Sequence, residues 1–372
     1  MNPPPDPIDL IAQGVFSSDP AKRKAARTAL GAHPDPRVSA YFLADKRNVH
    51  GLTDAAKFAK LVTEYEGLGL DGFDLAMAVL RAQKLNPLNG VRGIQFEAAL
   101  AYALRHAGRE TEVFVSLADQ TEMYLPSPKK ALPPGLSALQ ALTYLRVPEG
   151  TLRSADHLDE LAQIPQPFRL SLWVKDVKLT LWDAARNNIV GIDFRGAYSN
   201  LTDIAALAGW SRLTAVDLAH TGITDLAPLR SHPLEHLTVS DTRVADLSPL
   251  AAMRTLQTLR LSRLLRADLT PVWGLTEVED LVLSFTAVHD LAPLRAFHKL
   301  RRLDLWGTRF DSFEPLTGLP LEQLTANYSV VPDLSPLARI ATLRQVSLYG
   351  VPTDTPGYDV LRRERPDVFI SC

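Results

Sequence analysis

The feature that most constrains this sequence is a repeat with a period of 21 or 22 residues, running from Leu213 to Leu348. One unit of this length cannot bury its own leucine face, so successive units must stack on one another. The repeat therefore predicts an elongated solenoid rather than a closed globule. We number the units repeats 1 to 7 and count positions from their first residues, which are Leu213, Leu234, Leu256, Val278, Leu300, Leu321 and Leu343.

The first half of each repeat reads Leu-x-x-Leu-x-Leu. Positions 4 and 6 alternate with polar residues, as in a short strand with one buried face. Position 9 carries a hydroxyl that can bond the backbone where the chain leaves the strand. Leu264 interrupts this series and predicts a different turn in repeat 3. The hydroxyl residues are Thr221, Thr242, Thr286, Thr308 and Ser329.

The second half of each repeat reads Asp-Leu-x-Pro-Leu. Aspartate caps free N–H groups and proline fits the first turn, so this motif predicts the start of a helix or 3₁₀ helix. Repeat 5 has Ser312 in place of aspartate but keeps Pro315. No residue of the consensus carries chemistry, so we interpret these residues as scaffold. The aspartates are Asp225, Asp246, Asp268, Asp290 and Asp333.

The combined pattern LxxLxLxxTxIxDLxPLxxL resembles the short leucine-rich repeats of bacterial, internalin-like proteins. The resemblance covers residues 189–372 well and 139–188 loosely. It implies an α/β solenoid whose parallel sheet lines the concave face. The segment 361–370, LRRERPDVFI, is similar to the LRxxxPxxxI closing segment of such chains. It implies a C-terminal cap over 349–372, with a short helix over 357–363 and a last strand over 368–370.

Residues 1–118 read as an all-helical N-terminal domain. Helix signals start at Ser18-Asp19-Pro20 and recur over 53–66, 72–84 and 95–107. The helix, turn and helix over 18–45 resemble one HEAT-type unit. The string GLGLDG at 67–72 matches the G-x-G-x-x-G pattern of dinucleotide sites, which requires a preceding strand. Here the preceding segment reads as a helix, so we interpret the glycines as a turn between helices.

The sequence changes character after residue 110. The segment 111–119, TEVFVSLAD, reads as a strand, and 119–138 reads as a linker because LPSPKKALPPGLS holds four prolines. Residues 139–188 read as irregular repeats, with strands over 142–147 and 168–174 and a helix over 157–165. The regular repeats then occupy 189–348, beginning with a strand over 189–194.

Composition and motifs argue against several classes of function. A net charge of −2 does not suit a generic polyanion binder, so we expect no nucleic acid partner. The single cysteine, Cys372, excludes an internal disulfide, and with no signal peptide or membrane-spanning run we expect a cytoplasmic location. Zinc, Walker and nucleophile-elbow motifs are absent, and His220 and His236 have no third ligand nearby in the pattern. We therefore expect no cofactor, no metal and no catalysis.

The candidate binding residues occupy positions 5, 7 and 8, which face away from the core. Four aromatic residues fall there on successive repeats, and adjacent strands lie about 4.8 Å apart, so the rings can meet. We call Phe285, Trp306, Tyr328 and Tyr349 the aromatic patch. Asp304, Arg260 and Arg263 lie beside it in the pattern.

Two interpretations of the aromatic patch stay open. Large exposed aromatics are typical anchors for a protein partner, which makes the chain a non-catalytic interaction module. Alternatively, the rings pack on one another or on the C-terminal cap. A different class of function, an enzyme or small-ligand-binding protein, would place its site at the junction of the helical domain and the first repeats.

Overall fold

The computed structural model covers a chain of 372 residues that divides into two compact units. Unit 1 comprises residues 1–151 and 159–166, and unit 2 comprises residues 152–158 and 167–372. The structure describes residues 19–32, 55–67, 71–74, 76–77, 99–100, 102–103, 109–115, 117–125, 132, 134–147, 159–172, 186–194 and 201–372.

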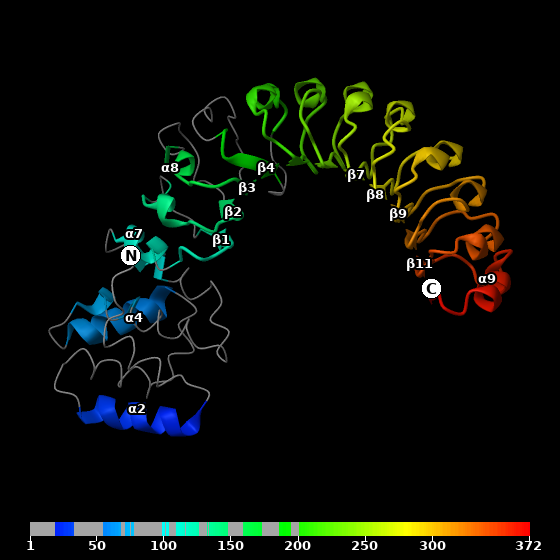
Figure 1. The fold of residues 1–372 in the computed structure, drawn as a ribbon. Helices are drawn as coiled ribbons and strands as arrows, with labels where there is room; N and C mark the ends of the chain where they lie inside the picture. The colour runs from blue at the N-terminus through cyan, green and yellow to red at the C-terminus, as the bar shows by residue number, and fades with distance from the viewer. Residues whose placement is uncertain are drawn as a thin grey trace. The chain divides into compact units, whose positions relative to one another are not determined.

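Unit 1 combines helices with two short strands (Figure 1). Strands β1 and β2 pair in parallel, with Met123 opposite Leu145. The predicted helices over 20–32 and 53–66 are confirmed as α2 and α4, and the predicted strand over 142–147 is confirmed as β2. Within the described residues, the elements of unit 1 whose bounds are defined are α2 Pro20–Ala32, α4 Ala55–Glu66, α7 Glu110–Val115, β1 Glu122–Tyr124, the 3₁₀ helix η3 Leu136–Ala138, β2 Tyr144–Val147 and α8 Asp159–Ala162.

The glycine-rich string at 67–72 follows a helix, as predicted. Helix α4 ends at Glu66, and the chain is helical again from Gly72. A Cβ on Gly72 would lie 2.2 Å from the carbonyl oxygen of Val62, so this glycine allows close packing against α4. The ring of Phe73 then reaches Phe58 at 5.9 Å between centroids. The second helix of the HEAT-type prediction lies outside the described residues, and the all-helical N-terminal domain stays a prediction.

The prediction of a strand over 111–119 is wrong. Residues Glu110–Val115 form helix α7 instead. A short apolar run has no periodicity that separates strand from helix, so tertiary packing decides. Val113 and Phe114 are fully buried, and Gly135 lies so close to Thr111 that a Cβ there would be 2.7 Å from its Oγ1.

Unit 2 contains the regular repeats, and repeats 1 to 6 each consist of one strand and one 3₁₀ helix. The strands lie on the inner, concave side of this unit and the 3₁₀ helices on its outer side (Figure 1). Its strands are β3 Phe168–Leu172, β4 Ile189–Asp193, β5 Ala215–Asp217, β6 His236–Thr238, β7 Thr258–Arg260, β8 Asp280–Val282, β9 Arg302–Asp304, β10 Gln323–Thr325, β11 Gln345–Ser347 and β12 Phe369–Ser371. Its helices are η6 Ala205–Gly209, η7 Ala227–Leu229, η8 Ser248–Ala252, η9 Thr270–Val272, η10 Ala292–Ala296, η11 Glu314–Leu316, η12 Ser335–Arg339 and α9 Tyr358–Glu364.

The strands of unit 2 form an open parallel sheet in which each strand pairs with the next along the chain. Equivalent positions pair throughout the repeats, so the leucines at position 4 stack in one row. Leu237 pairs with Leu259, and Leu281 pairs with Leu303. All four are at most 2% exposed, which confirms that position 4 faces the core.

The aspartate and hydroxyl residues of the motif stabilise the turns of the repeats that carry them, as predicted. Asp225 Oδ1 accepts a hydrogen bond from the backbone N–H of Ala227 at 2.7 Å, and the other motif aspartates make the same contact. Ser312 replaces the carboxylate with its hydroxyl and accepts the N–H of Glu314 at 3.0 Å. At position 9, Thr221 donates its hydroxyl to the carbonyl of Leu218 at 2.7 Å.

Repeat 3 turns differently, which confirms the prediction from Leu264. This side chain is buried at position 9, where repeats 1, 2, 4, 5 and 6 carry a hydroxyl. A second turn follows at Leu265 and Arg266, closed by a bond of 3.5 Å from the N–H of Ala267 to the carbonyl of Leu264. Leu265 is pushed to the surface, with 69% of its area exposed.

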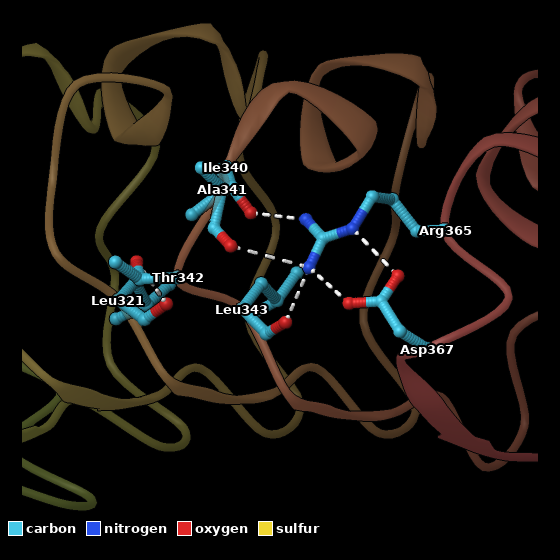
Figure 2. A network of polar contacts seen from close by, with 7 residues as sticks. All are labelled: Leu321, Ile340, Ala341, Thr342, Leu343, Arg365 and Asp367. Atoms are coloured by element: carbon cyan, nitrogen blue, oxygen red, sulfur yellow. Dashed lines mark hydrogen bonds and ion pairs between the residues drawn. The ribbon is translucent and has the colours of Figure 1, made fainter.

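The C-terminal segment covers the last repeat with helix α9 and strand β12. Figure 2 shows Arg365 at the centre of this contact. Its guanidinium donates hydrogen bonds to the carbonyls of Ile340, Ala341 and Leu343. It also donates to both carboxylate oxygens of Asp367, from Nε to Oδ1 at 3.0 Å and from Nη2 to Oδ2 at 2.8 Å. These carbonyls belong to the chain entering repeat 7, so Arg365 satisfies backbone groups that the end of the solenoid would leave open.

Candidate partner-binding surface

The four residues of the aromatic patch lie at the carboxyl ends of strands β8 to β11, where each strand turns outward. The rings of Phe285 and Trp306 lie 6.0 Å apart, and those of Trp306 and Tyr328 stack at 6.2 Å. The exposed fractions are 37% for Phe285, 41% for Trp306, 65% for Tyr328 and 49% for Tyr349. The first three rings therefore pack on one another, and all four keep a large solvent-facing area.

Position 8 of repeats 1 to 7 adopts a left-handed backbone, with φ between 53° and 73°. This conformation costs a residue with a side chain about 1–2 kcal/mol. A hydrogen bond offsets the cost in repeats 1 to 6, because the N–H at position 8 donates to the carbonyl at position 7 of the next repeat. The N–H of Phe285, for example, donates to the carbonyl of Trp306 at 2.7 Å. The residues in this conformation are His220, Asp241, Arg263, Phe285, Gly307, Tyr328 and Gly350.

Two glycines make room for the rings. The aromatic residue alternates between position 8 in Phe285 and Tyr328 and position 7 in Trp306 and Tyr349, and each position-7 aromatic is followed by glycine. A Cβ on Gly307 would lie 2.4 Å from Phe285 Cε1, and one on Gly350 would lie 2.4 Å from Tyr328 Cδ1. Each ring at position 8 therefore lies directly over the glycine of the next repeat. The sequence signal for this role is the pair of dipeptides Trp306-Gly307 and Tyr349-Gly350.

Polar side chains hold the backbone of the aromatic patch in place. Asp304 Oδ1 accepts the N–H of Trp306 at 2.9 Å. The amide of Asn327 is buried, and its Oδ1 accepts both the N–H of Tyr349 and the hydroxyl of Ser347 at 2.8 Å. Asp304 thus anchors a turn, and Asn327 is a supporting residue that the sequence pattern did not single out.

The two predicted arginines have different surroundings. The guanidinium of Arg263 lies over the ring of Phe285, 5.1 Å from its centroid, so it extends the aromatic patch by one cation. Arg260 lies 3.6 Å from Asp280, a half-buried carboxylate that also receives Arg302 at 3.3 Å. The structure therefore brings Arg263 to the aromatic patch and pairs Arg260 on the strand face.

Two exposed apolar residues near the aromatic patch were missed by sequence reasoning. Val330, 59% exposed, and Leu265 occupy position 10, just beyond the turn. The sequence could have indicated them, because the other repeats have glycine, alanine, proline or arginine at position 10, and a large apolar residue there is an exception. Phe369 of β12 is also exposed, but it pairs in register with Gln345, four residues before Tyr349.

The histidines and the cysteine form no shared centre in the part of the chain that the structure describes. His220 Nδ1 lies 2.9 Å from Asp241 Oδ2. Burial lowers the pKa of His236, and the guanidinium of Arg169 lowers it further. The Cys372 thiol lies 3.0 Å from the Tyr358 hydroxyl, and this hydrogen bond raises the pKa of Tyr358. Among the described residues, no cluster of three or more metal-ligating side chains occurs, and no helix is long and apolar enough to cross a membrane.

Parallel one-strand repeats with stacked leucines and a covered C-terminal end define a leucine-rich repeat protein. No protein-family model and no curated protein matches the sequence. The chain is similar in fold to an internalin, InlF, from Listeria monocytogenes, with 19% identity over 67% of this chain and 79% of that one, at a TM-score of 0.48. Internalin C2 from the same organism is 22% identical over 67% of this chain and 92% of that one, at a TM-score of 0.35. The ectodomain of the Arabidopsis thaliana receptor kinase GASSHO1, in complex with Casparian strip integrity factor 2, is 15% identical over 69% of this chain and 33% of that one, at a TM-score of 0.49.

Proposed function

We propose that this chain is a non-catalytic protein-interaction module whose aromatic patch anchors a protein partner on the concave face of the repeats. One observation carries the proposal. Of the seven large apolar side chains exposed among the described residues of unit 2, six lie at positions 7, 8 or 10 of repeats 3 to 7. Clustered exposed apolar area of this kind is typical of an interaction site, whereas single exposed side chains are not informative.

The position of the rings also favours recognition. Rings held by stacking and by hydrogen-bonded turns lose little conformational freedom when a partner binds. Tyrosine and tryptophan are enriched among residues that dominate binding energy. A reducing compartment such as the cytoplasm suits a chain whose single cysteine is free.

Truncation of Trp306 tests the proposal. The full chain is immobilised, partners are captured from a host lysate, and the affinity of a captured protein is measured for wild type and Trp306→Ala. We expect binding to weaken by at least about 2 kcal/mol, or about 30-fold in Kd. The loss of two ring pairs should also lower the free energy of unfolding by about 1–3 kcal/mol, so urea unfolding of the variant is measured in parallel.

Phe369→Ala is the matched control, since Phe369 is an exposed aromatic on the same sheet but outside the aromatic patch. It should leave binding unchanged. If Trp306→Ala lowers stability while the captured protein binds as tightly as before, the rings serve packing and the proposal is wrong.

A further inference from the structure

The turns that carry the aromatic patch also carry a local excess of positive charge. Positions 8 to 12 of repeats 2 to 6 contain no lysine or glutamate, and their two acids are Asp241 and Asp311. Four arginines occupy the same positions, although the chain as a whole has a net charge of −2. The arginines are Arg243, Arg263, Arg266 and Arg309, and all four are exposed.

These arginines differ from their neighbours in having no acidic partner. On the strand face, Arg301 pairs with Glu322 at 2.7 Å, and Arg302 pairs with Asp280 at 3.3 Å. None of the four turn arginines makes an ion pair with any residue in the described part of the chain. Of the two acids, Asp241 is bonded to His220. The turns therefore present guanidinium groups that make no ion pair. The nearest row of acids is at position 13, where each carboxylate accepts a backbone N–H at the start of a 3₁₀ helix; these are Asp246, Asp268, Asp290 and Asp333.

The charge is interleaved with the apolar side chains. Arg263 stacks on Phe285, and a guanidinium in this position keeps its edge N–H groups free to donate in pairs to a carboxylate. Arg309 forms a parallel backbone bridge with Val330, so a cation and an exposed apolar residue occupy adjacent turns. A ligand that covers the rings must also lie beside these cations.

The spacing of the rings suits an extended chain. The steps from Phe285 to Trp306 and from Trp306 to Tyr328 are 6.0 and 6.2 Å. In an extended peptide, alternate side chains on one face repeat every 6.4–6.8 Å, about twice the rise per residue. An extended segment running across the repeats can therefore place successive alternate side chains near successive rings.

We infer that the partner presents an extended segment with aspartate or glutamate side chains next to apolar ones. The apolar residues cover Phe285, Trp306, Tyr328 and Tyr349, and the carboxylates meet Arg243, Arg263, Arg266 and Arg309. This inference rests on the proposed function, since it assigns the chemistry of the segment that the aromatic patch binds.

The test uses the full chain and a displayed library of random 12-residue peptides. Peptides selected on the wild type are synthesised with a fluorescent label, and their Kd is measured by anisotropy. The charge-reversal variant is Arg263→Glu with Arg309→Glu. Its matched control is Arg230→Glu with Arg295→Glu, which makes the same charge change next to the 3₁₀ helices η7 and η10.

We expect the selected peptides to be enriched in aspartate and glutamate. Their affinity should fall about tenfold or more in the charge-reversal variant and less than about twofold in the control, and it should weaken as NaCl is raised from 50 to 500 mM. Binding should also be lost in Trp306→Ala.

Three results would overturn the inference. Peptides that need Trp306 but are neutral or basic, and are insensitive to charge reversal, would refute the acidic segment and leave the proposed function standing. Selection of no peptide would refute an extended segment as the ligand. Displacement of the peptides by a 12-nucleotide oligothymidylate at lower concentration than by unlabelled peptide would point to single-stranded nucleic acid, which also combines aromatic stacking with arginine contacts. Binding that does not need Trp306 would instead count against the proposed function itself.

Discussion

Replacing Gly307 by alanine tests whether the glycines of the turns position the aromatic patch. Gly307 has φ +63°, and a Cβ there would lie 2.4 Å from Phe285 Cε1 and 2.6 Å from its Cδ1. The left-handed backbone costs alanine about 1–2 kcal/mol. The displaced ring also loses its pair with Trp306, worth about 0.5–1.5 kcal/mol. We therefore expect the free energy of unfolding to fall by about 1.5–3.5 kcal/mol, measured by urea unfolding followed by circular dichroism.

Two further variants separate these contributions. Gly318→Ala is the matched control, because a Cβ there meets no atom within 4 Å and its φ is not positive. It should change the free energy of unfolding by less than about 0.5 kcal/mol. In a Phe285→Ala background, Gly307→Ala should cost only the backbone contribution of about 1–2 kcal/mol. Equal costs with and without the Phe285 ring, or a Gly307→Ala variant as stable as Gly318→Ala, would refute the positioning role.

Three other predictions concern the scaffold. Leu281→Ala should cost about 2–5 kcal/mol of unfolding free energy through a buried cavity, whereas Thr238→Ala on the outward face should cost less than about 0.5; equal shifts in Tm would contradict the assigned faces. Arg365→Ala should destabilise the cap by about 1.5–3 kcal/mol through lost charged hydrogen bonds, and exposed Arg363→Ala should not. The hydrogen bond from Arg365 lowers the pKa of the Asp367 carboxyl. The resulting stability is present above the unfolded pKa of about 3.9 and is lost as pH falls through the lower folded value, so thermal unfolding of Asp367→Asn should lose less stability than wild type below about pH 4.

Much of the candidate site could be predicted because it lies on a repeat. Once the period is known, the register of each strand follows, and Phe285, Trp306 and Tyr328 are assigned to adjacent turns from sequence alone. Their stacking and exposure confirm that placement. The roles of Asn327 and Gly307 could not be read in the same way. Both roles depend on which atoms of the neighbouring repeat lie in contact with these residues. The repeat pattern predicts that a neighbouring repeat is present but not which of its atoms make the contact.

The N-terminal part illustrates the opposite case. The segment 111–119 has the apolar, β-branched composition of a strand, yet residues Glu110–Val115 form a helix. No repeat fixes its register, so burial of Val113 and Phe114 and contact with Gly135 decide its conformation. The strand propensity of a short segment does not determine its conformation when packing against distant residues favours a helix.

The sequence by itself determined the leucine-rich repeat architecture, since a leucine period of 21 or 22 residues can be buried only by stacking strand on strand. It also determined the capped turns, because aspartate, proline and threonine act on backbone groups within a few residues of themselves. Only the tertiary structure decided the left-handed backbone at position 8, which depends on a hydrogen bond to the next repeat. It likewise decided which arginines keep their charge unpaired, because ion pairs form between side chains from different repeats.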